Sequence, residues 1–353
     1  MTMNRVIALT EKLIKNRSLS KDEWIYLIEN GETQKEYIFK KARQTCDAVY
    51  GKTVFIRGLI EFTNYCRNDC LYCGIRRSNE NAQRYRLSKD EILECCREGY
   101  KLGFRTFVLQ GGEDMFYTDD KLCEIISEIK SDFADCALTL SVGEREKESY
   151  ERYYNAGADR FLLRHETADD CHYKLLHPEN LKLANRMKCL YNLKEIGFQV
   201  GCGMMIGSPY QTAENIASDM LFLEELNPQM VGIGPFLSHK NTPFAGMENG
   251  SADKTILIVA LTRLLLPKAL LPATTALGTS DDSGREKAIL AGANVVMPNL
   301  SPKSVRKKYM LYDNKISTGD EAAESLNGLK KKFKKIGYEI VTDRGDYKDF
   351  KRL

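Results

Sequence analysis

Between residue 52 and about residue 300, short runs rich in β-branched and aromatic residues alternate with amphipathic helical patterns. This alternation predicts an α/β protein with a parallel sheet, because each helix carries the chain back to start the next strand in the same direction. We expect strands at residues 54–62, 106–110, 137–142, 160–165, 199–206, 230–236, 273–277 and 294–297. We expect helices at residues 88–102, 119–131, 146–155, 183–196, 213–226, 254–265 and 284–290.

Eight such units over roughly 250 residues fit a (β/α)8 barrel of the TIM type. A doubly wound sheet is the structural alternative. Residues 201–207 contain three glycines, but the third is misplaced for a dinucleotide-binding fingerprint and the stretch lies inside an expected strand. We therefore favour the barrel.

The segments on either side of the barrel have patterns of their own. Residues 1–50 carry helical periodicity throughout and predict an N-terminal helical segment. The barrel then covers residues 51–300, and residues 301–353 form a C-terminal extension that packs on it. In this extension we expect a loop at residues 312–321, then a helix and a short strand at 338–342.

The composition excludes several classes of protein. A formal net charge of +3 is too small to indicate nucleic acid or an anionic membrane as a partner. The sequence contains no signal peptide and no apolar run long enough to span a membrane. Most of the eleven cysteines fall in helical or strand patterns, where a free Cys behaves as a small hydrophobe. We therefore expect a protein of the reducing cytoplasm, without a disulfide framework.

Three cysteines, Cys66, Cys70 and Cys73, follow the first expected strand with the spacing Cys-x3-Cys-x2-Cys. Three thiolates on one loop can bind three irons of a 4Fe-4S cluster. Such clusters normally have four protein ligands, so one iron would be open to bind and activate a substrate. A zinc site and an electron-transfer cluster are the alternatives. Zinc would need a fourth Cys or His at short spacing, and none follows, while 353 residues are many for an electron carrier.

Polar residues at the ends of the other expected strands are candidates for the same site, because active sites of this fold lie at the carboxyl ends of the strands. They are the stretch 110–114, Thr139, Ser141, Arg164, Glu166, Met204, Met205, Thr274 and Thr275.

The cysteine motif, with Tyr72 before its last Cys and Gly111, Gly112 and Glu113 after the second strand, resembles the radical S-adenosylmethionine (radical SAM) superfamily. Further stretches are similar to the HydE family of FeFe-hydrogenase maturases, and the match runs in order from about residue 50 to about residue 312. These stretches are residues 55–62, 163–167, 231–236, 272–276 and 294–299. The cysteine motif alone would indicate only the superfamily.

The resemblance implies one 4Fe-4S cluster on Cys66, Cys70 and Cys73, with S-adenosylmethionine chelated at the open iron. One electron would cleave the sulfonium to methionine and a 5′-deoxyadenosyl radical, in a site closed to water. The cofactor-binding positions carried over from the superfamily are Tyr72, Gly111, Gly112, Glu113, Ser141, Glu166 and Arg186.

The implied roles differ among these positions. Tyr72 would lie against the adenine, the two glycines would let the backbone approach the methionine ammonium, and Ser141 would lie near the methionine or ribose. Glu166 would accept hydrogen bonds from the ribose, and Arg186 would pair with the methionine carboxylate. From the residues alone, Glu166 and Arg186 fit an ordinary ion pair equally well, Ser141 a helix cap, and the glycines a turn.

A substrate cavity is also implied, lined by Thr139, Arg164, Met205, Thr274, Thr275 and Tyr309. Alternatively, the threonines occur at these positions only because threonine is frequent in β-strands. HydE-like proteins are understood to act after HydG on a small Cys-bound Fe(CO)2(CN) precursor of the H-cluster. The implied partners are this small organometallic substrate, an electron donor and, transiently, HydG and HydF.

The sequence departs from the family's pattern in one respect. Some HydE proteins carry extra C-terminal cysteines for a second cluster, whereas none follows Cys202 here, so we expect one cluster. The same shortage argues against biotin synthase, which needs several cysteines on barrel strands. The remaining alternatives are a radical SAM mutase resembling methylornithine synthase and, from another class, a non-catalytic iron–sulfur scaffold or electron carrier.

Overall fold

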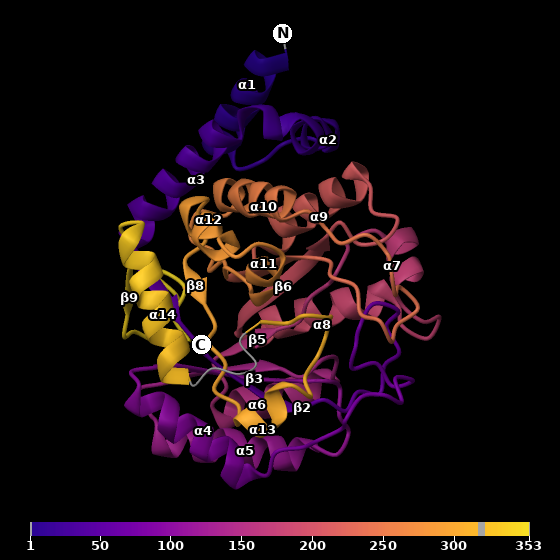
Figure 1. Ribbon diagram of the computed structural model, residues 1–353, viewed down its shortest axis with the longest axis vertical. Helices are drawn as coiled ribbons and strands as arrows, with labels where there is room; N and C mark the ends of the chain where they lie inside the picture. Colours follow the sequence, from indigo (N-terminus) through magenta and orange to yellow (C-terminus); the bar gives the residue numbers. More distant parts are fainter. Residues whose placement is uncertain (1, 317–321, 353) are drawn as a thin grey trace.

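The computed structural model describes residues 2–316 and 322–352, and its N-terminal helices stand at one end of the molecule (Figure 1). The capping box between Ser20 and Glu23 starts the second of these helices, whose Trp24 is fully buried. The helices are α1 (Thr2–Asn16), α2 (Lys21–Asn30), the 3-10 helix η1 (Gly31–Gln34) and α3 (Lys35–Tyr50). They pack on two helices of the following part, α9 (Ala213–Leu226) and α10 (Ala252–Leu265).

The strands form two parallel sheets at the centre of the molecule. In the smaller sheet, β1 (Thr53–Ile56) lies between β8 (Val295–Val296) and β9 (Glu339–Val341). The larger sheet has the order β2-β3-β4-β5-β6-β7, with every neighbouring pair parallel. Its strands are β2 (Gly58–Thr63), β3 (Thr106–Gly111), β4 (Ala137–Ser141), β5 (Arg160–Leu162), β6 (Gln199–Ile206) and β7 (Met230–Pro235). The α/β class with parallel strands is therefore confirmed.

Backbone hydrogen bonds join the first edge of the larger sheet to the smaller one. Strands β1 and β2 are consecutive in the chain, with only Arg57 between them. Beyond β8, the N–H of Leu59 donates to the carbonyl of Pro298 (2.9 Å), and the carbonyl of Leu59 accepts from the N–H of Leu300 (2.7 Å). Strand β2 thus has partners on both sides.

The segment 270–273 makes a similar connection at the other edge. The N–H of Val231 in β7 donates to the carbonyl of Leu270 (3.2 Å), and the N–H of Ala273 donates to the carbonyl of Val295 in β8 (2.8 Å). This segment therefore lies between β7 and β8.

The strand expected at residues 273–277 is wrong. Extended pairing ends at Ala273, and the following residues form helix α11 (Thr275–Ser280). Thr274 is the N-cap of this helix, and its side chain accepts a hydrogen bond from the N–H of Leu277 (3.3 Å). Threonine is frequent both in strands and at the N-cap of helices. At this position Thr274 caps a helix.

The remaining helices surround the strands (Figure 1). Helix α7 had no expected counterpart; Asp169 starts it by accepting a hydrogen bond from the N–H of His172 (2.8 Å). This helix, α7, covers Asp170–Leu176, and the short α13 (Lys303–Arg306) was not expected either. The expected helices are α4 (Lys89–Lys101), α5 (Asp119–Asp132), α6 (Lys147–Ala156), α8 (Leu183–Ile196), α12 (Gly284–Leu290) and α14 (Ala322–Lys335). Where bounds were predicted, they agree within two residues at each end.

The C-terminal extension contacts the sheets in two places. Its helix α14 and strand β9 match the expected helix and strand, and β9 adds to β1. Part of the loop expected at residues 312–321 falls on residues 317–321, which lie outside the described residues.

The tail after β9 crosses the end of the sheets at which the strands begin, which we call the amino end. There Arg160, fully buried at the start of β5, donates from Nη2 to Asp346 Oδ1 (2.6 Å) and to the carbonyl of Arg344 (2.8 Å). Gln199, at the start of β6, also donates to Asp346 Oδ1 (2.7 Å). The tail residues 343–347 therefore occupy the amino end.

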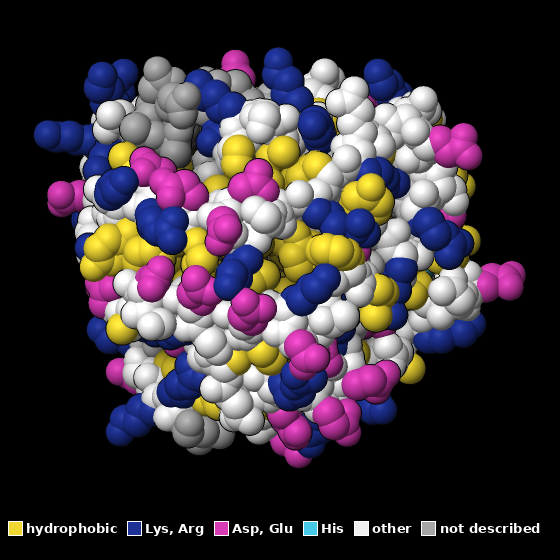
Figure 2. Space-filling view, turned by 90° about the horizontal axis from the view of Figure 1, so that it is seen from below, with side chains coloured by type: hydrophobic (Ala, Val, Ile, Leu, Met, Phe, Trp, Pro, Cys, Tyr) yellow, Lys and Arg dark blue, Asp and Glu magenta, His cyan; other side chains and the backbone are white. Residues whose placement is uncertain are grey.

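On the face that is lowest in Figure 1, Lys and Arg side chains are interspersed with Asp and Glu side chains and with exposed hydrophobic atoms (Figure 2). Within the part of the chain that the structure describes, no helix combines the length and apolar character needed to cross a membrane.

Candidate functional site

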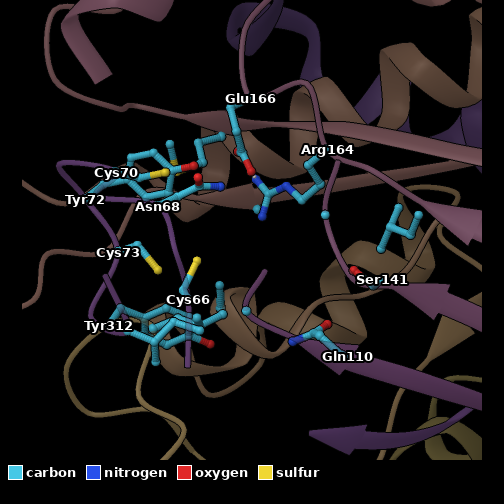
Figure 3. Close-up of a pocket in the computed structure, with 18 of the residues that line it drawn as sticks. Cys66, Asn68, Cys70, Tyr72, Cys73, Gln110, Ser141, Arg164, Glu166 and Tyr312 are labelled. Atoms are coloured by element: carbon cyan, nitrogen blue, oxygen red, sulfur yellow. The ribbon is translucent and has the colours of Figure 1, made fainter. Parts of the chain in front are cut away.

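A pocket opens at the carboxyl end of the strands, beside the cysteine loop. Of the residues predicted to bind the cluster, cofactor or substrate, all except Thr139 and Thr275 line this pocket, and of the other candidates Asp114 and Met204 do not. The binding residues that line it are Cys66, Cys70, Tyr72, Cys73, Gly111, Gly112, Glu113, Ser141, Arg164, Glu166, Arg186, Met205, Thr274 and Tyr309. Figure 3 shows the cysteine loop on one side of the pocket and Gln110 and Ser141, from the ends of β3 and β4, on the other.

The three cysteines stand on a loop that is tied down at several points. The N–H of Leu71 donates to the carbonyl of Leu176 (3.0 Å), and the N–H of Gly74 donates to the carbonyl of Leu311 (2.8 Å). Leu71 and Tyr72 also pack against a buried cluster that includes Met205. Figure 3 shows the sulfur atoms of the three cysteines around one space at this side of the pocket.

Gly112 is required by the packing of this loop. A Cβ atom at Gly112 would lie 2.2 Å from the carbonyl oxygen of Tyr65 and 2.7 Å from the Cβ of Cys66. Because side-chain atoms do not approach backbone atoms so closely, any larger residue would push the cysteine loop away from β3. The glycine therefore positions the cysteine loop, whatever else its bare backbone contacts.

The thiols are in surroundings that disfavour their ionised form. Burial raises the pKa of Cys66, and burial followed by the neighbouring Cys73 and Cys66 raises the pKa of Cys70 well above its ordinary value. Burial, and then Cys66, raises the pKa of Cys73 to about 12. Three adjacent buried thiolates therefore require a compensating positive charge, which the irons of a cluster supply.

The donor set fits a cluster better than a single ion. Among residues 2–316 and 322–352, no three His, Cys, Asp or Glu side chains converge on one point where a single metal ion would bind. In a 4Fe-4S cube each thiolate binds a different iron, so such convergence is not needed.

Arg164 and Glu166 face each other across the pocket wall (Figure 3), with Arg164 Nη2 3.0 Å from Glu166 Oε2. The angle does not suit a hydrogen bond, and neither of these two atoms has another hydrogen-bond partner in the described structure. Glu166 also has a φ of +66°, a left-handed conformation that is rare outside glycine and concentrates at functional sites. Buried polar groups left in this state fit a site completed by a ligand.

A buried pair of side chains supports this strained turn. The N–H of Gly203 donates to His165 Nδ1 (3.3 Å), so the ring carries a proton on Nε2, which lies 3.2 Å from Asp219 Oδ1. The N–H of Ala168 donates to the same carboxylate (2.5 Å). The N–H of Glu166 donates to the carbonyl of Gly203 (2.9 Å). Helix α9 and strand β6 together therefore hold the turn that aims Glu166.

Arg186 reaches the pocket from α8, but it does not pair with Glu166. Its Nε donates to Glu144, which follows β4, and its Nη1 donates to the carbonyl of Arg164 (2.7 Å). Glu113 in turn joins the same wall, because its Oε1 accepts from the N–H of Glu144 (3.0 Å) and its Oε2 accepts from Arg67 Nε (3.0 Å). The Glu113 carboxylate therefore connects the cysteine loop to the end of β4.

The ring of Tyr72 contacts His177, and Tyr173 in turn holds that histidine. His177 Nδ1 donates to the carbonyl of Tyr173 (2.9 Å), so its Nε2 accepts from the Tyr72 hydroxyl (3.3 Å). The rings of Tyr173 and His177 stack with centroids 3.9 Å apart. Burial, and then the charge of Arg186, lowers the pKa of His177 to about 3 and keeps the ring neutral.

The far wall of the pocket is formed by a segment of the C-terminal extension. Tyr309 and Tyr312 line the pocket, and Gln110 donates to the Tyr309 hydroxyl (3.4 Å). Lys315 donates to the carbonyl of Tyr309 (2.9 Å) and pairs with the buried Glu61 of β2. This buried ion pair fastens the segment that carries Tyr309 and Tyr312.

Two predicted residues lie elsewhere. Thr139 is two residues before Ser141 on β4, so it points to the same face one layer deeper, and its buried hydroxyl has no partner in the described structure. Thr275 is the first residue of α11, and its hydroxyl accepts from Arg285 (3.3 Å) rather than facing the pocket.

The sequence analysis missed Asn68 and Tyr312, polar residues that line the pocket, and Glu144, the partner of Arg186. Asn68 lies inside the cysteine motif and Glu144 shortly after an expected strand, so position in the sequence could have indicated both. Tyr312 gave no such signal, because only the fold brings it back to the cysteine loop.

Comparison with known proteins agrees with this geometry. The model of the radical SAM superfamily matches residues 60–223. The [FeFe] hydrogenase maturase subunit HydE of Thermotoga maritima is 44% identical over 313 residues, which cover 89% of each chain. The 3-methylornithine synthase of Methanosarcina acetivorans is 29% identical over 90% of this chain and 89% of its own.

Solved structures show the same fold. The crystal structure of methylornithine synthase (PylB) superimposes with a TM-score of 0.83 at 25% identity, covering 94% of this chain and 97% of that one. The FeFe-hydrogenase maturase HydG from Carboxydothermus hydrogenoformans gives a TM-score of 0.79 at 20% identity, covering 99% and 87%. With the cysteine loop, the pocket and 44% identity to HydE together, the chain belongs to the radical SAM superfamily and, within it, to the family of the [FeFe] hydrogenase maturase HydE.

Proposed function

We propose that this protein is a radical SAM enzyme that reductively cleaves S-adenosylmethionine and acts in the maturation of FeFe-hydrogenase. The observation that carries the proposal is the convergence of Cys66, Cys70 and Cys73 on a pocket whose paired Arg164 and Glu166 keep atoms without hydrogen bonds. The similarity to HydE supplies the biological setting.

We assign the three cysteines as the ligands of one 4Fe-4S cluster that leaves one iron open. When bound and reduced, this cluster supplies the electron that breaks the sulfonium of S-adenosylmethionine. The absence of any cysteine after Cys202 supports a single cluster.

The remaining residues bind and orient the cofactor. Glu166 accepts hydrogen bonds from the ribose hydroxyls through a carboxylate that the left-handed turn aims into the pocket. Arg186 pairs with the methionine carboxylate, since its guanidinium is buried and fixed by Glu144. Ser141 lies near the methionine or ribose, and the fixed ring of Tyr72 lies against the adenine.

We further propose that the two sheets close into a (β/α)8 barrel, with residues 1–50 and 301–353 as separate segments outside it. The backbone hydrogen bonds at Leu59 and through residues 270–273 support closure at both edges. A closed barrel covered at its mouth by Tyr309 and Tyr312 would keep water from a reactive radical.

For the substrate we propose a small Cys-bound Fe(CO)2(CN) precursor of the H-cluster. Arg164, Met205, Thr274 and Tyr309 line the same pocket and offer one cation and two hydroxyls to a small anionic ligand. Thr139 is kept as a deeper contact because its buried hydroxyl is unpartnered, and Thr275 as a residue that positions the cap of α11.

An electron donor is a required partner, and transient contact with HydG and HydF follows from the maturation role. All eleven cysteines are free, which supports our assignment to the reducing cytoplasm.

A radical SAM mutase similar to methylornithine synthase is the second candidate. It is favoured by the match to PylB over nearly the whole length of both chains. The higher identity to HydE, 44% against 29%, favours the maturase.

Two assays test the proposal. Anaerobically reconstituted protein, supplied with dithionite and S-adenosylmethionine, is expected to produce 5′-deoxyadenosine; no product would remove the enzymatic function. Expression in a hydrogenase-producing host that lacks its own HydE is expected to restore hydrogenase activity. Cleavage without restoration in that host, where the host's own HydE restores activity, would favour the mutase.

A further inference from the structure

An exposed patch beside the cysteine loop has no role in the pocket. It consists of Tyr65, Met115 and Phe116, whose side chains are 36%, 54% and 48% exposed, and of the cations around them. Tyr65 directly precedes Cys66, and Met115 and Phe116 follow the motif of residues 111–113. Exposed apolar side chains clustered in this way are typical of a contact surface for a partner.

The patch is held together by cations on aromatic rings and on sulfur. The Arg86 guanidinium lies 3.8 Å from the centroid of the Tyr65 ring and 4.6 Å from that of Phe116, and Lys121 Nζ lies 3.5 Å from the Phe116 centroid. Arg145 donates to Met115 Sδ (3.6 Å).

The outward charge of the patch is positive. In the pair of Arg67 with Glu113, the arginine side chain is 48% exposed and the carboxylate 7%. In the pair of Arg86 with Asp114, the corresponding values are 34% and 4%. In both pairs the cation faces solvent and the anion is buried.

Carboxylates flank the patch on one side. Asp120 is paired with Arg152, and Asp119 and Glu146 line the same hollow as Arg67 and Met115. A partner that covers Tyr65 and Phe116 meets the cations of Arg86 and Lys121, which lie against these rings.

We propose that this patch, Tyr65, Met115 and Phe116 with Arg67, Arg86, Lys121 and Arg145, is the docking surface for a small acidic one-electron carrier. The inference rests on the proposed function, which requires that a cluster on Cys66, Cys70 and Cys73 be reduced. One electron passes from the reduced carrier to the oxidised cluster, and the carrier leaves oxidised by one electron. The backbone that bears the patch also bears Cys66, so a carrier bound here stands next to the cluster.

The size of the patch fits this occupant. Electron-transfer complexes are weak and use small interfaces, because the carrier must dissociate after each transfer. Charge complementarity gives such complexes their association rate more than their affinity. Three exposed apolar side chains inside a ring of cations suit that kind of encounter better than a permanent subunit contact.

The test compares two reductants on the same reconstituted protein. Dithionite is small and needs no docking surface. An acidic flavodoxin, kept reduced by its reductase, has to dock on the protein before it can transfer an electron. The variants are Lys121→Glu, Phe116→Ala and their combination, none of which touches the pocket. We expect the double variant to lower the second-order rate constant for reduction by flavodoxin about tenfold or more at low ionic strength, and added salt to slow the wild type more than the variant.

Controls separate this surface from others and from the proposed function itself. The control variants are Lys307→Glu and Lys331→Glu. Lys307 lies on the opposite flank of the cysteine loop, and Lys331 lies on α14. Both side chains are exposed to solvent, as that of Lys121 is. Their reduction by flavodoxin is expected to equal that of the wild type, and dithionite-driven cleavage of S-adenosylmethionine is expected to be unchanged in every variant. An unchanged flavodoxin rate in the double variant, or an equal loss in either control, would overturn the docking surface. Failure of dithionite-driven cleavage in the wild type would instead overturn the enzymatic function.

Discussion

The two ends of the parallel strands hold arginines in opposite ways. At the amino end, Arg160 is completed by the chain's own tail, through the carboxylate of Asp346 and the carbonyl of Arg344. At the carboxyl end, Arg164 and Glu166 lie 3.0 Å apart with atoms that have no hydrogen-bond partner. The tail completes the buried charge of Arg160 and stabilises the fold, whereas the Arg164–Glu166 ion pair keeps atoms without hydrogen bonds at the pocket, where a ligand can complete them.

At the amino end, the surroundings of Asp346 favour its ionised form. Burial alone would raise the pKa of Asp346, but the charge of Arg160 and the hydrogen bonds from Arg344 and Gln199 hold it well below its ordinary value. The carboxylate is therefore ionised at neutral pH and compensates the charge of Arg160 there.

The largest effect is expected at the open end. Cys70→Ala removes one ligand of the proposed cluster, so the formation of 5′-deoxyadenosine should fall below detection, as measured by chromatography of anaerobic reactions. The matched control is Cys171→Ala, at an exposed cysteine outside the pocket, which should retain wild-type activity. Continued cleavage by the Cys70 variant would show that the cluster is bound elsewhere.

The next largest effect is expected at the closed end. Asp346→Ala leaves Arg160 buried without its carboxylate, so we expect the free energy of unfolding to fall by about 3–5 kcal/mol. Chemical denaturation measures this change, with Asp349→Ala, an exposed carboxylate on the same tail, as the control. If both variants were equally stable, the tail would not be needed to compensate the amino end.

At the carboxyl end of the strands, Arg186→Ala should weaken the binding of S-adenosylmethionine. Loss of one hydrogen bond to a charged group corresponds to about 1.5–3 kcal/mol of binding free energy. Equilibrium titration of the reconstituted protein measures it, and Lys188→Ala, on the exposed side of the same helix, is the control. An affinity equal to that of the wild type would remove Arg186 from the cofactor site.

The smallest effect concerns pH. The folded pKa of His177, about 3, lies below the ordinary value of 6.5, so its contribution to stability is complete above pH 6.5 and is lost as the pH falls toward 3. Between pH 7 and pH 5 this amounts to about 2 kcal/mol. The difference in unfolding free energy between the wild type and His177→Gln should shrink by that amount over this range. A constant difference would mean that His177 titrates normally in the folded protein.

Local signals account for what the sequence predicted well. The bounds of α8, α9 and β6 agree with the expected ones, since each is delimited by residues with local conformational preferences. Gly197, with a φ of +105°, ends α8, and Thr212 begins α9 with a reciprocal cap. The spacing of the three cysteines likewise lies within one loop, and all three line one pocket.

Contacts between distant segments account for what the sequence missed. The pairing of residues 270–273 between β7 and β8 depends on neighbours rather than on their own pattern, so the strand was placed too late. Glu144, not Glu166, is the partner of Arg186, because the end of β4 lies nearer to α8 than the spacing of residues could indicate. Tyr312 reaches the pocket only because Lys315 is paired with Glu61 on β2.

The central claim is that the open end holds a cluster with one iron free for S-adenosylmethionine. Mössbauer spectroscopy of anaerobically reconstituted, ⁵⁷Fe-enriched protein tests it most directly. The account predicts about four irons per chain, as one cubane cluster requires, with one iron whose signal separates from the others when S-adenosylmethionine is added. Four irons with a spectrum that S-adenosylmethionine leaves unchanged would contradict it.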